Sequence, residues 1–230
     1  MRHRVITLLA ALSCTFVAGP SDAAEISARD SIDVRLEPAE VLRIDEPEPE
    51  HFFYHGYGYG SDQMIHPIRL ILNGGFGILQ VGNRDNSLSA IDYETGAENV
   101  YDNLRYPLKA IREEGLAEFV ATQILPFSVN SKKAYYWPNY TLHLIGGGMS
   151  YRMMEEWFRA HRFPHPTVPS LLTISVYHLL NEVVENRDFV GYTTDPIADI
   201  YLFTPAGILV FSSDRVSRFF SRTLNMADWS

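Results

Sequence analysis

Six polar side chains in the second half of the sequence could support chemistry, because they recur at helical spacing among apolar residues. They are His143, His178, Asn181, Glu182, Glu185 and Asp199. His178 and Glu182 lie four residues apart, so on a helix both can reach one ion. With His143 and Asp199 they would form a shell of nitrogen and oxygen ligands suited to zinc, iron or manganese. Glu185 could then serve as a general base.

The same side chains could instead form a buried polar network that needs no cofactor. The sequence has no metalloprotease HExxH, no paired ExxH of di-iron bundles and no hydrolase GxSxG motif. Asp199 lies on an apolar helix and must find a partner, because an uncompensated buried charge costs several kcal/mol. The available partners are His143, His178 and Asn181. We therefore favour the network without a cofactor, and keep a divalent metal as the alternative.

Three successive helices are expected to position these side chains, over about residues 139–161, 168–186 and 195–211. On the second helix the polar residues, together with Ser175, fall within a stripe narrower than about 90° at 100° per residue. An ordinary solvated face would carry Lys or Arg, and this stripe has neither. The pattern therefore predicts that the three helices meet around the polar side chains.

The third helix carries its own start signal and an interruption. Asp195 is expected as the N-cap, with Pro196 at the first helical position. Pro205 removes a backbone hydrogen bond in the middle of the apolar run, which predicts a kink. Asp195 is therefore assigned a structural role.

Charged residues on the first helix are spaced three and four apart, as Arg152, Glu155, Glu156 and Arg159. This spacing is typical of an ion-paired surface that faces solvent. On the other side of the helix, Gly146 precedes Ser150 by four residues, which suits close contact with another helix. We therefore expect His143 to lie in a helix contact and the charged cluster to lie outside it.

The remaining body of the chain is also expected to be helical. Residues 66–80 form an apolar helix whose three glycines let another helix approach, since they match neither a dinucleotide fingerprint nor a phosphate loop. Two amphipathic helices follow between residues 99 and 127, with Gly115 ending the first. The fold class is therefore mainly α, a compact helical bundle with few short strands.

Residues 213–230 predict an amphipathic basic helix, with Arg215, Arg218 and Arg222 along one side and apolar residues opposite. Such a helix could lie on an anionic membrane surface. It could equally close the bundle with its arginines in solvent. Both placements remain open at this point.

Residues 1–23 have the organisation of a secretory signal peptide. Two arginines precede the apolar run from Val5 to Val17, which is shorter than the roughly 20 residues that cross a bilayer. A small-x-small site ends at Ala23, so we expect export and cleavage after it. Cys14 could be lipidated, but the residues before it form a poor lipobox, and we expect it to belong to the apolar run.

Residues 24–61 are expected to be a flexible segment that is acidic and Pro-rich at first, then rich in Tyr and Gly. Within it, residues 32–36 alternate as a strand would. The aromatic and glycine residues from His51 to Gly60 are expected to be exposed in a mobile loop or a contact surface. Residues 62–230 then form the helical domain.

Composition narrows the functions that this chain can have. Cys14 is the single cysteine, so removal of the signal peptide leaves no disulfide or thiolate chemistry. The formal net charge is −9, and no basic patch occurs in the body of the chain. Nucleic acid is therefore not expected as a partner, because phosphate binding needs clustered cations.

Three runs in the second half resemble an uncharacterised group of bacterial cell-envelope proteins, over about residues 99–229. The runs are NYTLHLIGGGMSYRMMEEWF, SVYHLLNEVVEN and GYTTDPIADIYLFTPAGILVF. In that family the helical region can precede an outer-membrane β-barrel. No strands of that kind are expected after Trp229, so the resemblance implies a short member or a shortened chain. It implies no known activity.

Two functions of different class follow from these patterns. The first is an exported envelope protein of the periplasm or outer membrane, membrane-associated and non-enzymatic, whose partner is a membrane surface or another envelope protein. The second is a membrane-associated, metal-dependent hydrolase that uses His178, Glu182 and Asp199. Bound metal would favour the second function.

Overall fold

The computed structural model describes five ranges of the chain, and within them it contains helices and no strand. The ranges are 50–56, 65–80, 87–125, 134–188 and 191–227. The predicted signal peptide, the acidic segment with its alternating residues 32–36, and the Tyr- and Gly-rich residues 57–60 lie outside the described residues. His51 to Ser230 form one compact unit. The predicted mainly α bundle is confirmed.

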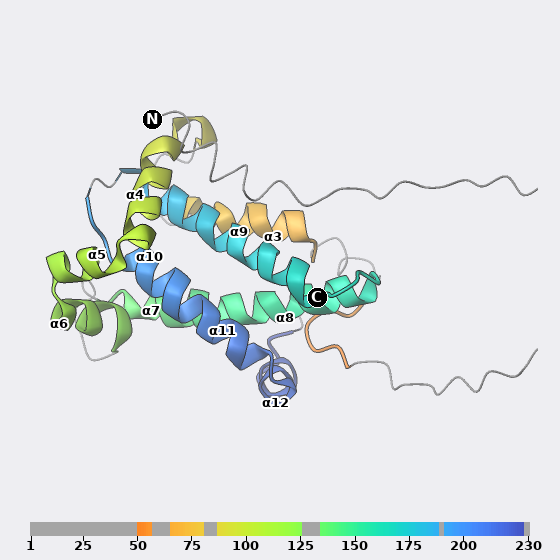
Figure 1. Cartoon of the computed structure of the whole chain (residues 1–230). Helices are drawn as coiled ribbons and strands as arrows, with labels where there is room; N and C mark the ends of the chain where they lie inside the picture. Colours follow the sequence, from red (N-terminus) through yellow and green to blue (C-terminus); the bar gives the residue numbers. More distant parts are fainter. Residues whose placement is uncertain (1–49, 57–64, 81–86, 126–133, 189–190, 228–230) are drawn as a thin grey trace, which may run out of the picture. The chain divides into compact units, whose positions relative to one another are not determined.

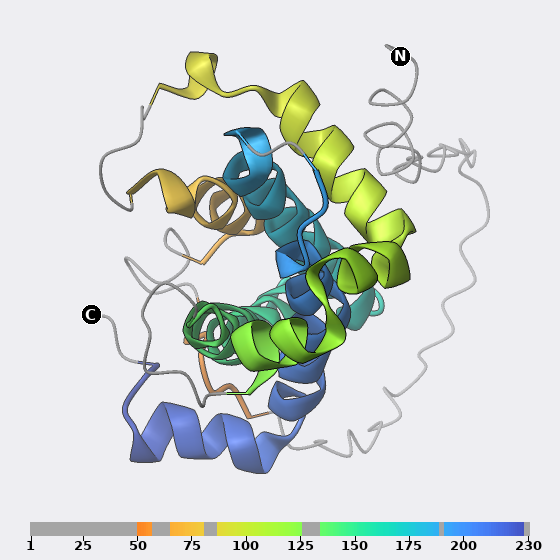
Figure 2. The same cartoon turned by 90° about the vertical axis from the view of Figure 1, so that its left-hand side faces the viewer.

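Four helices run alongside one another and form the body of this unit (Figures 1 and 2). They are α3 (Pro67–Gly75), α8 (Gly147–Ala160), α9 (Thr167–Glu185) and α11 (Thr204–Phe211). Two of them are extended at their N-terminal ends by π-helical turns, which are η5 (Asn139–Gly146) before α8 and η7 (Asp199–Phe203) before α11. The short helix α10 (Asp195–Ala198) precedes η7. The three helices predicted from the sequence are therefore present.

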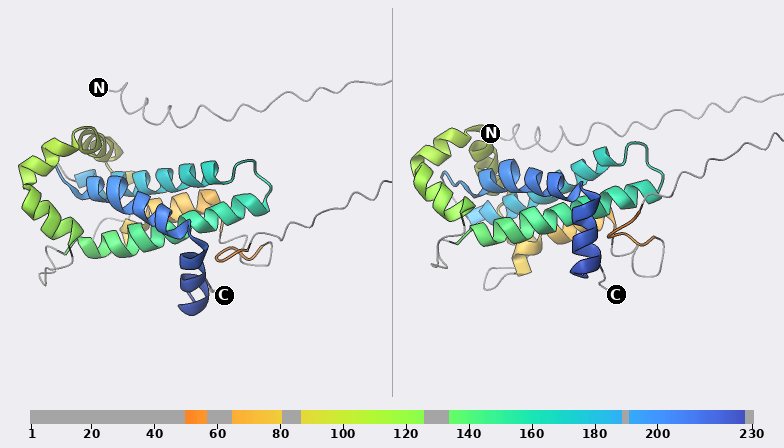
Figure 3. Two further views of the ribbon diagram at one scale, coloured as in Figure 1. Left: turned by 60° about the horizontal axis from the view of Figure 1, so that its bottom comes forward. Right: turned by 90° about the horizontal axis from the view of Figure 1, so that it is seen from below.

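A second group of helices crosses one end of the bundle (Figures 2 and 3). It consists of α4 (Tyr93–Arg105), α5 (Pro107–Glu114), α6 (Leu116–Phe119) and the π-helical turn η3 (Val120–Ile124). Asp92 starts α4 earlier than predicted, because its carboxylate accepts the Thr95 N–H at 3.0 Å. Gly115 ends a helix with φ of 100°, as predicted, but the first of the two predicted helices is divided at Tyr106 into α4 and α5. The remaining short elements are η1 (Gly77–Gln80), η2 (Leu88–Ala90), α7 (Tyr136–Pro138) and η6 (Asn186–Asp188).

Glycines allow two of the helix contacts to be close. A Cβ at Gly75 would lie 2.5 Å from the Leu180 side chain, and one at Gly74 would collide with the Tyr177 ring. The predicted approach of another helix to this glycine run is therefore confirmed, and that helix is α9. Between α8 and α11, a Cβ at Gly148 would lie 2.6 Å from the carbonyl oxygen of Gly207.

The aromatic residues that start the compact unit are buried, so the prediction of an exposed loop or contact surface is wrong for them. Phe52, Phe53 and Tyr54 are at most 1% exposed. Their three backbone N–H groups donate to the Glu156 carboxylate at 2.8–3.0 Å. The segment is held by a residue about a hundred positions away, which local sequence cannot reveal.

The prediction of an ion-paired surface on α8 is wrong for half of its charged residues. Arg152 and Glu156 form the expected i,i+4 pair at 2.9 Å, but both are buried. A second oxygen partner, on Asp214, lies 2.8 Å from the Arg152 guanidinium. Glu155 and Arg159 form the remaining pair at 3.7 Å and keep partial exposure. The buried pair is satisfied because Glu156 also accepts the N–H groups of the aromatic segment.

The start of the third helix differs from the prediction by one residue. Thr194 occupies the N-cap position, and Asp195 lies in the first turn with Pro196 next to it. Asp195 is therefore not the N-cap. A π-helical turn, η7, ends two residues before Pro205, and the kink predicted there stays a prediction.

The C-terminal helix packs on the bundle. It comprises α12 (Asp214–Arg218) and the π-helical turn η8 (Phe219–Thr223), and it turns away from the preceding helix (Figure 3). The Ser217 hydroxyl donates to the carbonyl of Phe211 at 2.9 Å, and the rings of Phe211 and Phe220 lie 4.9 Å apart. This supports the closing-helix alternative, with the three arginines at exposed positions.

Within the described part of the chain, no single helix has both the length and the apolar composition to cross a membrane. Taken together, the segments Asp195–Phe211 and Asp214–Thr223 have the required length and apolar composition, but the chain bends by 82° between them.

Candidate metal centre

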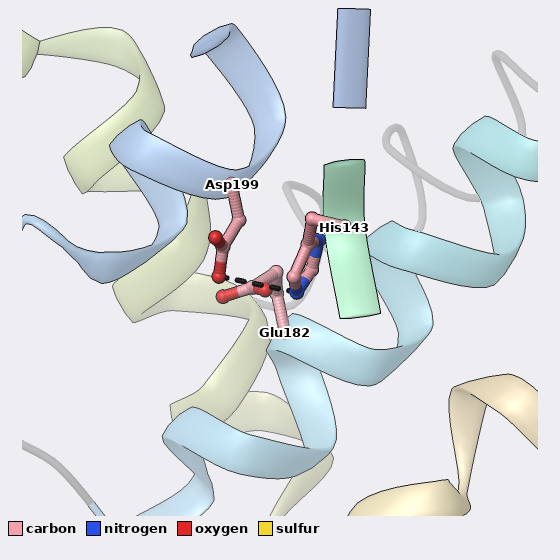
Figure 4. Close-up of side chains that lie close together, drawn as sticks. All are labelled: His143, Glu182 and Asp199. Atoms are coloured by element: carbon pink, nitrogen blue, oxygen red, sulfur yellow. Dashed lines mark ion pairs between the residues drawn. The ribbon is translucent and has the colours of Figure 1, made fainter. Parts of the chain in front are cut away.

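Three side chains from three elements converge inside the bundle (Figure 4). His143 comes from η5, Glu182 from α9 and Asp199 from η7. One ligating atom from each lies within 4.8 Å of the others, and His143 Nε2 lies 3.3 Å from Asp199 Oδ2. All three side chains are at most 5% exposed. Three of the four predicted metal ligands therefore meet at one point.

Two local features of the backbone position this group. His143 and Asp199 both lie in π-helical turns, which are rare and frequently occur at functional sites. The wider π-helical turn shifts each side chain relative to the regular helix that follows. Gly148 and Gly207 bring the backbones of the two elements together directly beyond these turns.

His178 is the fourth predicted ligand and lies beside the group rather than in it. Its ring centroid is 4.6 Å from that of His143, with the planes tilted by 34°. A Cβ at Gly147 would lie 2.7 Å from His178 Nε2, so the glycine leaves the space that this ring occupies. The imidazole is 1% exposed, and neither ring nitrogen has a hydrogen-bond partner among the described residues.

Burial favours the uncharged form of all four groups when no cation is bound. It lowers the pKa of His143 to about 4, and burial together with His143 lowers the pKa of His178 to about 3. Burial, followed by the charges of Asp195 and Glu185, raises the pKa of Asp199 to about 9. Burial and then the charge of Asp199 raise the pKa of Glu182 well above its ordinary value. These shifts favour the neutral forms of His143 and Asp199 in their 3.3 Å contact.

The polar atoms of the group are incompletely satisfied. His143 Nδ1, Glu182 Oε1 and Asp199 Oδ1 are buried without a hydrogen-bond partner among the described residues. Neither carboxyl forms an ion pair with Lys or Arg in the described part of the chain. Buried groups of this kind normally have partners, because each unsatisfied one costs about 1–3 kcal/mol.

A divalent cation fits this donor set. Imidazole nitrogen and carboxylate oxygen are ligands of zinc, manganese and ferrous iron. Ligand atoms about 2 Å from a tetrahedral ion lie roughly 3.3–3.5 Å apart, and the contact between His143 and Asp199 has this spacing at 3.3 Å. Two carboxylates would balance the charge of a dication. Three protein ligands would also leave a coordination position open.

The other predicted residues lie outside the group. Asn181 donates to the Gly74 carbonyl at 3.2 Å, so its inclusion in the network was wrong. Ser175 is exposed. Glu185, predicted as a general base, is half-buried one turn beyond Glu182 and acts on the carboxyl pair through its charge.

One residue that supports the group was missed in the sequence. The Asn186 amide donates to the Glu182 carbonyl at 2.9 Å and lies 3.4 Å from its carboxylate. Asn186 follows Glu182 by four residues, so helical spacing could have indicated it. It lies at the end of the predicted helix, where the polar stripe was not followed further.

Comparison of the chain with protein-family models, curated proteins and solved structures finds no match. The resemblance to bacterial envelope proteins therefore stays a prediction.

Proposed function

We propose that this chain is an exported cell-envelope protein whose helical domain holds one divalent metal ion. His143, Glu182 and Asp199 are its protein ligands. The observation that carries the proposal is the convergence of three buried ligating atoms within 4.8 Å of one another. Export rests on the signal-peptide pattern of residues 1–23.

A metal accounts for the group better than the polar network without a cofactor. In such a network each buried atom needs a partner, and two carboxyl oxygens, Glu182 Oε1 and Asp199 Oδ1, have none among the described residues. A metal would use one ligating atom of each side chain and would favour the ionised carboxylates. The donor chemistry supports zinc, manganese or ferrous iron.

Metal content and thermal stability test this proposal. Protein purified without added metal is expected to contain close to one divalent ion per chain by elemental analysis. Chelation should lower Tm, and adding the ion back at about 100 times Kd should raise it by roughly 5–10 °C. Asp199→Asn should abolish both effects. Asp102→Asn, at an exposed position on α4, is the matched control and should behave as wild type. No bound metal and no change in Tm would contradict the proposal.

A metal-dependent hydrolase is the second candidate function, and the position of His178 favours it. The three ligands leave a coordination position open, and the His178 ring borders both the ligand group and an apolar cleft. In this function Glu182 and Asp199 would hold the ion, the ion would lower the pKa of the attacking water, and His178 would orient that water. Hydrolysis of p-nitrophenyl butyrate that is lost after chelation and in His178→Gln would support it. Activity that survives both changes would contradict it.

The same proposal places the protein at a membrane surface. Its support is a set of exposed apolar side chains in η7, α11 and η8, namely Leu202, Leu209 and Phe219, with Leu209 77% exposed. Arg215, at an exposed position between Leu209 and Phe219 in the chain, could meet anionic lipid. Carbonate extraction of membranes tests this part. Complete recovery of the protein in the soluble fraction before extraction would count against it.

A further inference from the structure

Two further carboxylates lie one helical turn from the proposed metal ligands. Glu185 follows Glu182 by three residues at the end of α9. Asp195 precedes Asp199 by four residues, at the start of the helix that continues into η7. Residues at these spacings lie on one face of a helix, with about 5–6 Å between their Cβ atoms. Each of the two helices that meet at the candidate centre therefore carries one buried and one partly exposed carboxylate.

The charges of the two further carboxylates reach both buried ones. Burial is the largest cause of the raised pKa values of Glu182 and Asp199, and the charges of Asp195 and Glu185 add to it in both cases. Asp195 therefore acts on a group of the neighbouring helix, and so does Glu185. One dication would balance Glu182 and Asp199 and would leave the two further carboxylates beside it.

The buried carboxyls also offer a second oxygen each. His143 lies on one side of the two carboxyl groups, and its 3.3 Å contact is with Asp199 Oδ2 (Figure 4). Asp199 Oδ1 and Glu182 Oε1 are buried and have no hydrogen-bond partner in the described ranges. A carboxylate that holds one ion through one oxygen can hold a second ion through the other, as in two-metal sites.

Buried amides support the Asp195 carboxylate. The Asn139 amide donates to Gln123 Oε1 at 2.8 Å, and the Gln123 side chain donates to Asp195. Both amide residues are at most 4% exposed. Asp195 forms no ion pair with Lys or Arg in the described part of the chain. Hydrogen bonds of this kind typically orient carboxylates that bind a metal.

We propose that Glu182, Glu185, Asp195 and Asp199 bind a second, weaker divalent cation beside the first, with Glu182 and Asp199 shared between the two ions. The inference rests on the proposed function, because both ions use these two ligands. The partly exposed side chains of Glu185 and Asp195 turn toward the second ion and complete its site. A site of carboxylate oxygens suits hard dications such as Mn²⁺ and Mg²⁺. Shared carboxylates place the two ions about 3.5–4 Å apart.

Titration with Mn²⁺ tests the proposal on the purified full chain, after chelation has removed bound metal. Calorimetry should show one tightly and one more weakly bound Mn²⁺ per chain. The second Mn²⁺ should produce the exchange-coupled EPR spectrum of a close pair. A single bound Mn²⁺, or two without coupling, would overturn this inference and leave the proposed metal centre standing. Absence of any bound Mn²⁺ would overturn both.

Substitution of Asp195 separates the two ions. Asp195→Asn should weaken binding of the second Mn²⁺ by about 10- to 100-fold and remove the coupled spectrum. It should retain the first Mn²⁺, which also shows that the variant is folded. Asp102→Asn, at an exposed position on α4, is the control and should bind both ions. Glu185→Gln makes the same test from α9 if Asp195→Asn does not fold. Unchanged binding of the second Mn²⁺ in these site variants would overturn the proposal.

Discussion

At the scale of single residues, four buried titratable groups determine how the candidate metal centre responds to pH, namely His143, His178, Glu182 and Asp199. Without a cation, the lowered pKa values of His143 and His178 and the raised pKa values of Glu182 and Asp199 favour the neutral form of each group. A bound dication would favour the ionised carboxylates and displace their protons. Metal binding is therefore expected to tighten as the pH rises.

The metal-free protein is expected to lose stability between about pH 7.5 and about 9. In this range the folded state holds a proton on Asp199, whose pKa is about 9, whereas an unfolded aspartate is ionised. The folded state binds more protons, so the free energy of unfolding falls as pH rises, by about 1.4 kcal/mol per pH unit for each such group. The histidines contribute little here, because above about pH 7.5 they are almost entirely neutral in the unfolded as well as the folded state.

Chemical unfolding of chelated protein at several pH values measures this slope. The amide side chain in Asp199→Asn cannot ionise. This variant should therefore show a slope of unfolding free energy against pH that is smaller by the contribution of one group. The pH window also excludes Asp195, because its pKa is raised only to about 6. Parallel slopes for wild type and Asp199→Asn would show that Asp199 is not a buried acid of raised pKa.

At the scale of helices, close packing between α8 and α11 holds the two sides of the centre together. Gly148 faces the Phe211 ring and the Gly207 backbone, and Gly207 faces the carbonyl oxygens of Leu144 and His143. These contacts involve backbone atoms, which cannot move aside as a flexible side chain can. The positions of His143 and Asp199 therefore depend on residues without a side chain.

Gly148→Ala is expected to destabilise the fold by about 1–3 kcal/mol, because the added methyl group would overlap Phe211 and the Gly207 carbonyl. The free energy of unfolding in urea measures this change. Gly77→Ala is the control, since a Cβ there meets nothing within 4 Å, and it should be neutral. Equal stability of the two variants would mean that the α8–α11 contact is looser than described.

The buried pair on α8 makes a second prediction at this scale. Glu156→Gln removes the charge that accepts the N–H groups of Phe52, Phe53 and Tyr54 and that faces Arg152. Breaking a buried pair in this way should cost about 3–5 kcal/mol. Hydrogen exchange should accelerate at residues 52–54.

Glu113→Gln provides the control for that substitution. Glu113 pairs with Lys109 at 4.0 Å on the surface, with 51% of its side chain exposed, so its loss should be nearly silent. Unchanged protection of residues 52–54 in Glu156→Gln would contradict the role assigned to Glu156.

The sequence predicted the helices and most of the centre, because apolar periodicity is a local signal. It placed His143, His178, Glu182 and Asp199 inward, and all four are buried. The prediction that Asn181 belongs to the network was wrong. Neighbouring residues on a helix point about 100° apart, so the Asn181 side chain points away from Glu182 and reaches the Gly74 carbonyl.

Other features depend on contacts that no local pattern contains. The π-helical turns around His143 and Asp199 arise from packing, and a regular helical wheel cannot show them. Burial of Glu156 depends on a segment 102–104 residues away in the chain, so a charged i,i+4 pair was interpreted as a surface feature. Long-range pairing of this kind became visible only in three dimensions.

At the scale of the whole molecule, Arg152 links the first described segment to the C-terminal helix. Its guanidinium contacts Glu156, which holds residues 52–54, and Asp214 at the start of α12. It also lies over the Phe52 ring at 4.9 Å. The beginning and the end of the compact unit therefore share one buried cation.

Export is the prediction that concerns the whole chain. Full-length protein produced in a bacterium is expected to be recovered from the envelope fraction with Ala24 as its N-terminal residue. Intact-mass measurement and N-terminal sequencing determine this. A charged substitution in the apolar run, such as Leu9→Arg, should retain the uncleaved form inside the cell. An unprocessed wild-type chain that stays in the cytoplasm would contradict export.

The bound metal is the central claim, and anomalous diffraction from a crystal of the purified protein tests it most directly. Data collected on both sides of the absorption edge of the ion found by elemental analysis should give one strong peak. The peak should lie about 2.0–2.2 Å from His143 Nε2 and from one oxygen each of Glu182 and Asp199. A map without a peak there, in protein that was never exposed to chelator, would contradict the account.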